Sequence, residues 1–272
     1  MNNNPIGFFD SGLGGLTCIP PLLKKMPEQK IIYYGDTART PYGSKDPKTI
    51  ITFAKEIISF LIRKRAKLIV IACNTVSAVA LSELRKEFSE FPIIGIISPA
   101  VNEIINNCDE KNNIGIIGTR ATVNTSAYKK KIHKKNPFLN IFEHSCPAFV
   151  PLIEEGIVKN EIMDLTIKYY LDGFIERNKI DTLVLGCTHY PFIKKSIEKF
   201  YKGIKMINPS EEVLVSILDE LKDKDLFAEK KSSAALSKIG HEFYASDLSE
   251  NFTNMLDVIF REENFTVSFL SP

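Results

Sequence analysis

The chain has 272 residues, of which 44% are hydrophobic, so it is long enough for one large or two medium-sized domains with a substantial core. Its 35 lysine and arginine residues nearly balance 33 aspartate and glutamate residues, and the net charge of +2 argues against a nucleic-acid partner. The sequence contains no apolar run of the ~18 residues that a membrane span needs, and its N-terminus lacks the features of a secretory signal. We therefore expect a cytoplasmic protein that binds neither nucleic acid nor membrane.

The first part of the chain alternates short apolar runs with helix-like patterns. A glycine-rich loop at 10–15 and a polar loop at 35–47 interrupt the alternation. Strands are predicted at 6–9, 31–34, 68–72 and 93–97, and helices at 16–25, 48–64 and 77–88. This βαβα series predicts a mostly parallel sheet.

After Ser98 and Pro99 the same pattern begins again. The predicted order is a helix from about 100, a strand at 114–117, a helix through 128–132, a strand near 141–142, helices to about 178 and a strand at 182–186. The tail from 210 onward has a helical stretch and a strand candidate at 265–270. We expect an α/β fold of two similar lobes, residues 1–98 plus about 209–272 and residues 99–208, with a ligand site in the cleft between them.

Two segments, Leu68–Thr75 (LIVIACNT) and Thr182–His189 (TLVLGCTH), resemble each other, and each places a cysteine directly after a predicted strand. Carboxyl ends of parallel strands are where α/β proteins build their sites. A following helix N-terminus would lower the pKa of Cys73 and of Cys187 toward the thiolate form. Two matched thiols favour chemistry on both sides of one small molecule.

The other three cysteines, Cys18, Cys108 and Cys146, are interpreted as small buried hydrophobic residues. The cysteine total is odd and the sequence has no C-x-x-C pair, so we expect neither a disulfide framework nor a metal site.

Six motifs, two of which contain Cys73 and Cys187, occur in a characteristic order: Phe8–Gly15 (FFDSGLGG), Tyr34–Gly43 (YGDTARTPYG), Cys73–Thr75 (CNT), Ile114–Val123 (IGIIGTRATV), Val150–Gly156 (VPLIEEG) and Gly186–Pro191 (GCTHYP). With these motifs the chain resembles the glutamate racemases of the cofactor-independent aspartate/glutamate racemase family. It departs from that family's usual pattern at Thr40, Val76 and Ala121, none of which removes a proton-transfer group.

The resemblance implies an isomerase that interconverts L- and D-glutamate without a cofactor and supplies D-glutamate for peptidoglycan. Inversion of a carbon needs a base on one face and an acid on the other. The resemblance assigns the thiol of Cys73 to the D-enantiomer and that of Cys187 to the L-enantiomer. It gives supporting roles to Asp10, His189 and Glu154, with Glu154 preferred over its neighbour Glu155, and it allows a homodimer.

The resemblance also implies that neutral donors bind the substrate. The expected residues are Asp10, Ser11, Tyr42, Gly43, Asn74, Thr75, Thr122, Thr188 and His189. By the residues alone, Asp10, Asn74 and Thr75 equally fit helix caps.

Two other motifs have simpler interpretations. The glycines at 12–15 do not form G-x-G-x-x-G, and are expected to allow close approach of a small anion. Asp36 and Arg39 are expected to form a loop ion pair.

Two alternatives remain open for the function. A racemase for aspartate or another amino acid would keep both thiols and differ only in the residues that bind the carboxylates. A non-catalytic amino-acid-binding or regulatory protein could use the same scaffold, although the presence of both cysteines argues against it.

Overall fold

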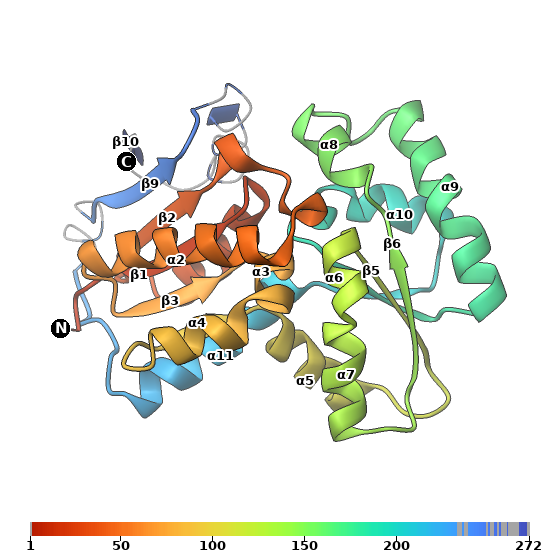
Figure 1. The fold of residues 1–272 in the computed structure, drawn as a ribbon, viewed down its shortest axis with the longest axis horizontal. Coiled ribbons are helices and arrows are strands. Elements are labelled where there is room, and N and C mark those ends of the chain that lie inside the picture. Colours follow the sequence, from red (N-terminus) through yellow and green to blue (C-terminus); the bar gives the residue numbers. More distant parts are fainter. Residues whose placement is uncertain are drawn as a thin grey trace.

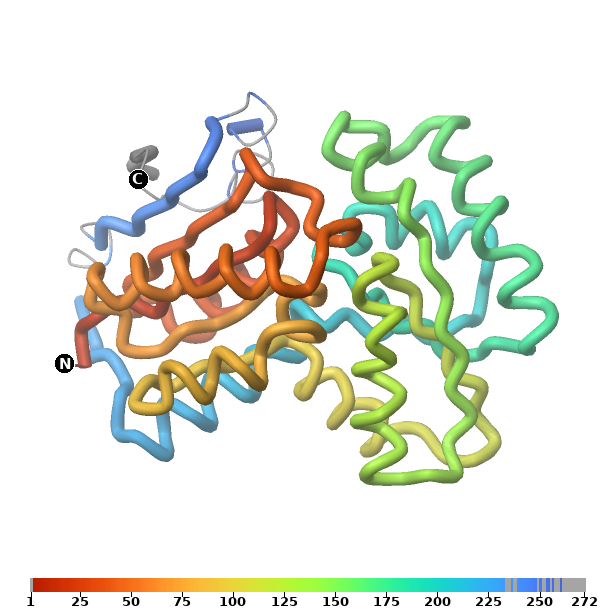
Figure 2. The backbone as a smooth tube through the Cα atoms, in the orientation of Figure 1, coloured from red at the N-terminus to blue at the C-terminus, as the bar shows by residue number. Residues whose placement is uncertain are grey.

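A computed structural model describes residues 2–232, 236, 239–248, 250, 253, 254, 256, 260 and 267–270. The chain forms two α/β halves that lie side by side, each with its own parallel sheet (Figure 1). In Figure 2 the chain begins in one half, passes through the second half in the middle of the sequence and returns to the first near its end. Within the described residues, no helix is long and apolar enough to cross a membrane.

The first half contains a six-stranded parallel sheet in the order β10-β9-β2-β1-β3-β4. Its strands are β1 (Ile6–Asp10), β2 (Ile31–Gly35), β3 (Leu68–Ile71), β4 (Ile93–Gly95), β9 (His241–Ala245) and β10 (Val267–Leu270). Successive side chains of β1 point to opposite faces, so Phe8 packs in the core that includes α1 (Ile19–Lys25) and α11 (Pro209–Asp223), and Phe9 packs in the core that includes α2 (Pro47–Arg63). Both faces are therefore buried, which explains the continuous apolar runs.

The helices of this half connect the strands or return from the second half. They are η1 (Gly14–Cys18, a 3₁₀ helix), α1 (Ile19–Lys25), η2 (Thr37–Arg39), η3 (Tyr42–Ser44), α2 (Pro47–Arg63), α3 (Asn74–Val79), α4 (Leu81–Glu87) and α11 (Pro209–Asp223).

The second half contains a four-stranded parallel sheet in the order β6-β5-β7-β8. Its strands are β5 (Asn113–Gly118), β6 (Asn140–Ser145), β7 (Thr182–Gly186) and β8 (Lys205–Ile207). Its helical elements are α5 (Ile97–Asn107), α6 (Arg120–Thr125), α7 (Ala127–Lys135), α8 (Phe149–Glu154), α9 (Glu161–Asn178), η4 (Tyr190–Ile193) and α10 (Lys194–Phe200). The core on one face of this sheet is continuous with the core under the first sheet, so the two halves share buried apolar contacts.

The predicted α/β class with two parallel sheets is confirmed. Several element limits were wrong. The helix predicted at 77–88 begins at Asn74 and is divided near Ala80, and α5 begins at Ile97 because a proline in the first helical turn removes no intrahelical hydrogen bond. Strands β8 and β9 were not predicted. Of the strand candidate at 265–270, residues 265 and 266 lie outside the described residues, and the domain limits remain a prediction.

Candidate active site

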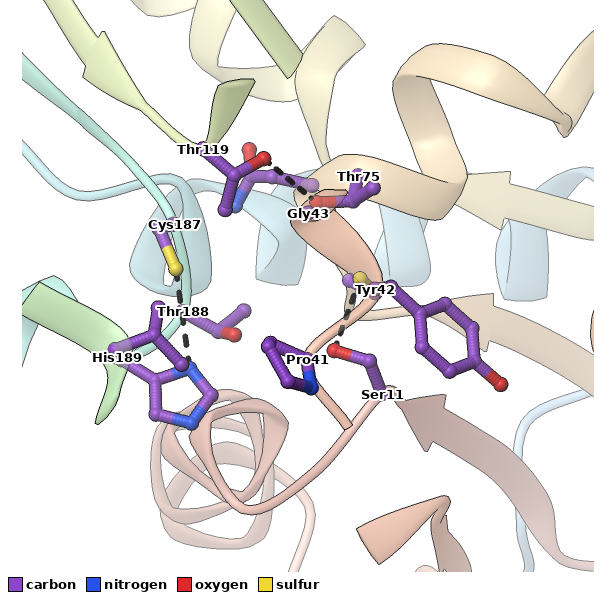
Figure 3. Close-up of a pocket in the computed structure, with 12 residues that line it drawn as sticks. Ser11, Pro41, Tyr42, Gly43, Thr75, Thr119, Cys187, Thr188 and His189 are labelled. Carbon is purple, nitrogen blue, oxygen red and sulfur yellow. Dashed lines mark hydrogen bonds between the residues drawn. The ribbon is translucent and has the colours of Figure 1, made fainter. Parts of the chain in front are cut away.

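The two cysteines singled out in the sequence lie at one small pocket between the halves (Figure 3). Cys73 follows β3 and Cys187 follows β7, so the pocket is built at the carboxyl ends of strands from both sheets. The space in this pocket, including the part open to solvent, is about 280 Å³. Its lining residues are Ser11, Pro41, Tyr42, Gly43, Cys73, Asn74, Thr75, Thr119, Val150, Cys187, Thr188 and His189.

Cys73 is the residue before the first turn of α3 and is 3% exposed. Its thiol donates to Ser11 Oγ at 3.5 Å. Burial raises the pKa of Cys73, the negative charge of Asp10 adds to the rise, and hydrogen bonds to Ser11 and the Val76 backbone oppose it. The expectation that the helix would lower this pKa was therefore wrong, because the desolvation of a buried thiol outweighs the dipole of a six-residue helix.

Asp10 is fully buried at the end of β1, beside the pocket-lining Ser11. Its Oδ2 accepts hydrogen bonds from the backbone N–H of Gly15 at 2.8 Å and from Thr188 Oγ1 at 3.3 Å. Its Oδ1 is also buried and has no hydrogen-bond partner among the described residues. Leaving a buried carboxylate oxygen without a partner costs free energy. A bound cation that donates a hydrogen bond to Oδ1 of Asp10 would remove this cost.

Cys187 has a different set of neighbours. The thiol lies 3.8 Å from His189 Nδ1, and His189 Nε2 lies 3.1 Å from Glu154 Oε1. Glu154, rather than Glu155, is thus the residue that contacts His189. Thr40 Oγ1 donates to the same oxygen of Glu154 at 3.4 Å, which connects the polar loop of the first half to this group.

The protonation of His189 follows from these contacts. Burial lowers the pKa of His189, but the hydrogen bonds to Cys187 and Glu154, together with their charges, raise it to well above its ordinary value. A cationic imidazole therefore lies between the thiol and the carboxylate. The helix setting predicted for Cys187 was wrong, because a turn and the 3₁₀ helix η4 separate it from α10.

Asn74 and Thr75 form the first turn of α3 and do not cap it, because Cys73 occupies the cap position. The side-chain Oδ1 of Asn74 accepts a hydrogen bond from Tyr128 Oη at 2.6 Å, and its Nδ2 is buried without a partner among the described residues. Thr75 Oγ1 lies 3.0 Å from Thr119 Oγ1, across the boundary between the halves. The pocket therefore has an unused amide donor at Asn74.

Thr122 was expected to bind the substrate, but it does not line the pocket. Its hydroxyl lies 3.1 Å from Thr119 Oγ1 and 3.4 Å from Thr75 Oγ1. Thr122 therefore contacts two residues of the lining without belonging to it. Thr119 lines the pocket instead, and sequence reasoning missed it together with Pro41 and Val150. The signal for Thr119 was its place directly after β5, equivalent to the places of the two cysteines.

Tyr42 and Gly43 contribute to the pocket through their positions in η3. The Tyr42 ring points away from the pocket, and its hydroxyl donates to Asp36 (Figure 3). Asp36 also accepts two hydrogen bonds from Arg39 Nε, at 3.0 and 2.7 Å, so the predicted loop ion pair is confirmed.

The glycine loop after β1 closely approaches the second half. A Cβ atom on Gly14 would lie 2.5 Å from Thr188 Oγ1 and 2.7 Å from His189 Nδ1, and one on Gly15 would lie 2.5 Å from Asp10 Cβ. Real Cβ contacts are essentially never this short, so glycine is required for the close approach. The small residues of this loop allow the turn after β7 to reach the pocket, and the approach of a small anion to the loop stays a prediction.

The described residues contain no group of three or more histidine, cysteine or acidic side chains that could hold a metal ion. All five cysteines are free.

Comparison with known proteins gives consistent relatives. The sequence profile of the Asp/Glu/Hydantoin racemase family matches residues 18–216. The glutamate racemase of Aquifex aeolicus (strain VF5) is 40% identical over 258 residues, which cover 95% of this chain and 94% of the relative.

Solved structures are also similar. The crystal structure of glutamate racemase from Francisella tularensis subsp. tularensis SCHU S4 in complex with D-glutamate has a TM-score of 0.89 and 38% identity, covering 100% of this chain and 98% of that one. That of the Escherichia coli enzyme in complex with L-glutamate and the activator UDP-MurNAc-ala has a TM-score of 0.78 and 25% identity, covering 98% of each chain.

Proposed function

The chain belongs to the Asp/Glu/Hydantoin racemase family of isomerases, and from that premise we propose that it is a glutamate racemase that interconverts L- and D-glutamate by two-cysteine proton transfer. The observation that carries the proposal is that Cys73 and Cys187 line one small pocket from opposite halves. Relatives solved with D-glutamate and with L-glutamate support glutamate as the substrate.

The proposed reaction needs one thiolate and one thiol. In the L-to-D direction Cys187 removes the α-proton and Cys73 delivers a proton to the opposite face, and in the reverse direction the two residues exchange roles. The mechanism needs no cofactor for proton transfer, since the two side chains supply both the base and the acid.

Charge that develops on the substrate must be stabilised within the pocket. The unpartnered Nδ2 of Asn74 is placed to donate to a substrate carboxylate, and the hydroxyls of Ser11, Thr75 and Thr188 offer further hydrogen bonds. Asp10 does not line the pocket, but it adjoins the lining residue Ser11, and its unpartnered Oδ1 supports a role in accepting a hydrogen bond from the substrate ammonium. A bound ammonium would lower the pKa of Cys73, which burial and the charge of Asp10 raise.

The wider role we propose is the supply of D-glutamate for peptidoglycan, by a protein that acts in the cytoplasm. A homodimer is compatible with this role. We place Cys73, Cys187, Asp10, His189 and Glu154 in the catalytic group.

The decisive experiment follows the circular dichroism of L-glutamate with wild-type protein and no added cofactor. We expect loss of optical activity, with incorporation of solvent deuterium at the α-carbon. Cys73→Ala and Cys187→Ala should each lower kcat by roughly 10²–10⁴-fold or more. Cys108→Ala is the matched control, because Cys108 does not line the pocket.

Normal turnover in either pocket-cysteine variant would refute the two-cysteine mechanism. Turnover of aspartate but not glutamate would assign another amino acid to the same chemistry. Binding of glutamate without racemisation would indicate a non-catalytic binding protein.

A further inference from the structure

We propose that Tyr128 is a positioning residue of this site: its hydroxyl fixes the side-chain amide of Asn74 so that the N–H group, and not the oxygen, faces the substrate. The inference rests on the proposed function. It adds Tyr128, which lies outside the motifs described in the sequence analysis. Tyr128 lies in α7 of the second half, and Asn74 lies in α3 of the first half.

The hydrogen bond between Tyr128 and Asn74 is short, and both residues are buried. Tyr128 Oη lies 2.6 Å from Asn74 Oδ1. Tyr128 is fully buried and Asn74 is 2% exposed, so water does not compete for this hydrogen bond. Burial also raises the pKa of Tyr128, so the hydroxyl keeps its proton and acts as a donor.

The single hydroxyl hydrogen decides the amide orientation. An asparagine amide has an acceptor at one end and a donor at the other, and its end groups exchange by a half-turn. If the amide were reversed, Nδ2 would donate to Tyr128 Oη, and the tyrosine hydrogen would lose Asn74 Oδ1, the acceptor to which it donates in this structure. Leaving that hydrogen unpaired costs about 1–3 kcal/mol, so the orientation with Nδ2 free is favoured.

The orientation determines what the pocket can bind. With Nδ2 facing the pocket, Asn74 donates to a carboxylate oxygen, whereas the reversed amide would present an oxygen and repel it. Because the hydrogen bond crosses between the halves, the binding-competent amide is available only when α7 and α3 are in contact. Tyr128 thereby links the assembly of the two halves to recognition of the carboxylate.

The test compares kinetic constants of the wild type, Tyr128→Phe, Asn74→Ala and the double variant, measured with L-glutamate and with D-glutamate. In Tyr128→Phe the amide samples both orientations, so a fraction of the free protein is unable to bind. Equal sampling of the two orientations halves the competent fraction, so we expect KM to rise about twofold, because apparent affinity scales with that fraction. We expect kcat to change by less than twofold, since a bound carboxylate itself holds the amide in place.

Two comparisons separate positioning from a merely structural role. In the Asn74→Ala background the Tyr128→Phe change should leave KM unchanged, because the amide it positions is gone. Tyr190→Phe is the matched control: Tyr190 is fully buried and donates to the Cys146 carbonyl at 3.0 Å, so it loses an equivalent hydroxyl and should keep the wild-type KM.

An unchanged KM in Tyr128→Phe, or an equal increase in the Asn74→Ala background, would overturn the proposal while leaving the racemase function intact. An inactive wild type would instead refute the proposed function, and the positioning role with it.

Discussion

The close contact at Gly14 predicts that Gly14→Ala separates the two halves at the active site. The added Cβ would lie 2.5 Å from Thr188 Oγ1, 2.7 Å from the backbone carbonyl carbon of Thr188 and 2.7 Å from His189 Nδ1. The threonine hydroxyl can rotate, but the backbone carbon and the imidazole have little freedom, because His189 is held between Cys187 and Glu154. An ordinary contact therefore requires the loop or the turn after β7 to move by about 1 Å.

The size of the effect follows from overpacking and from catalytic geometry. Inserting a methyl group into a packed contact costs about 1–3 kcal/mol, so the free energy of unfolding in urea should fall by that amount. A displacement of about 1 Å between reacting groups lowers rates by roughly 10²-fold. We expect kcat/KM for glutamate to fall by about that factor, measured by circular dichroism on protein that is still folded.

Gly173→Ala is the matched control for this prediction. Gly173 lies inside α9, and its added Cβ would meet only the end of the Arg177 side chain, at 3.2 Å from Nη1. That flexible group can move away, so the substitution should stabilise the protein by about 0.5–1 kcal/mol and leave activity unchanged. The prediction is refuted if the kcat/KM of Gly14→Ala stays within tenfold of the wild-type value and its free energy of unfolding stays within about 0.5 kcal/mol of the wild-type value.

Three further predictions concern ionisable groups. Glu154→Gln should lower the pKa of His189, because the carboxylate that raises it is neutralised; an unchanged NMR titration would contradict this. Burial lowers the pKa of His241 from 6.5 to about 4, so below about pH 6.5 the unfolded chain takes up the proton first. Stability should then fall by up to about 3 kcal/mol between pH 6.5 and 4, and His241→Gln should flatten this slope in urea titrations at several pH values. Asp36→Asn should cost about 3 kcal/mol in unfolding free energy, because the fully buried carboxylate pairs with Arg39; a loss below about 1 kcal/mol would show that the pair is not needed.

The parts of the fold that local patterns encode could be predicted from the sequence. Strands β1, β2, β3 and β7 are buried on both faces, so each is a continuous apolar run. Strand β9 contains His241 and Glu242, and β8 has only three residues, beginning with the exposed Lys205. Neither pattern differs enough from a loop to predict a strand, and only pairing with a neighbouring strand defines them.

The candidate site was predictable to the extent that strand ends define it. Each cysteine could be placed at the carboxyl end of a strand in its own sheet, and two similar lobes with a cleft between them predict that both strand ends face one site. Side chains that meet only through the docking of the two halves could not be found this way. Asn74 and Tyr128 are 54 residues apart, and no local pattern connects them.

The two thiols have opposite electrostatic surroundings, although the segments that carry them are near-duplicates. A cationic His189 lies beside Cys187, whereas Cys73 lies near the buried carboxylate of Asp10, whose charge adds to the rise in the pKa of Cys73. The protein thus supplies a positive charge on one side only. In the proposed reaction the substrate ammonium supplies the positive charge on the Cys73 side. It does so by binding Asp10 and offsetting the negative charge of that carboxylate. A ligand that lacks the ammonium should therefore leave Cys73 a thiol, which makes the substrate itself part of the machinery for the D-side proton transfer.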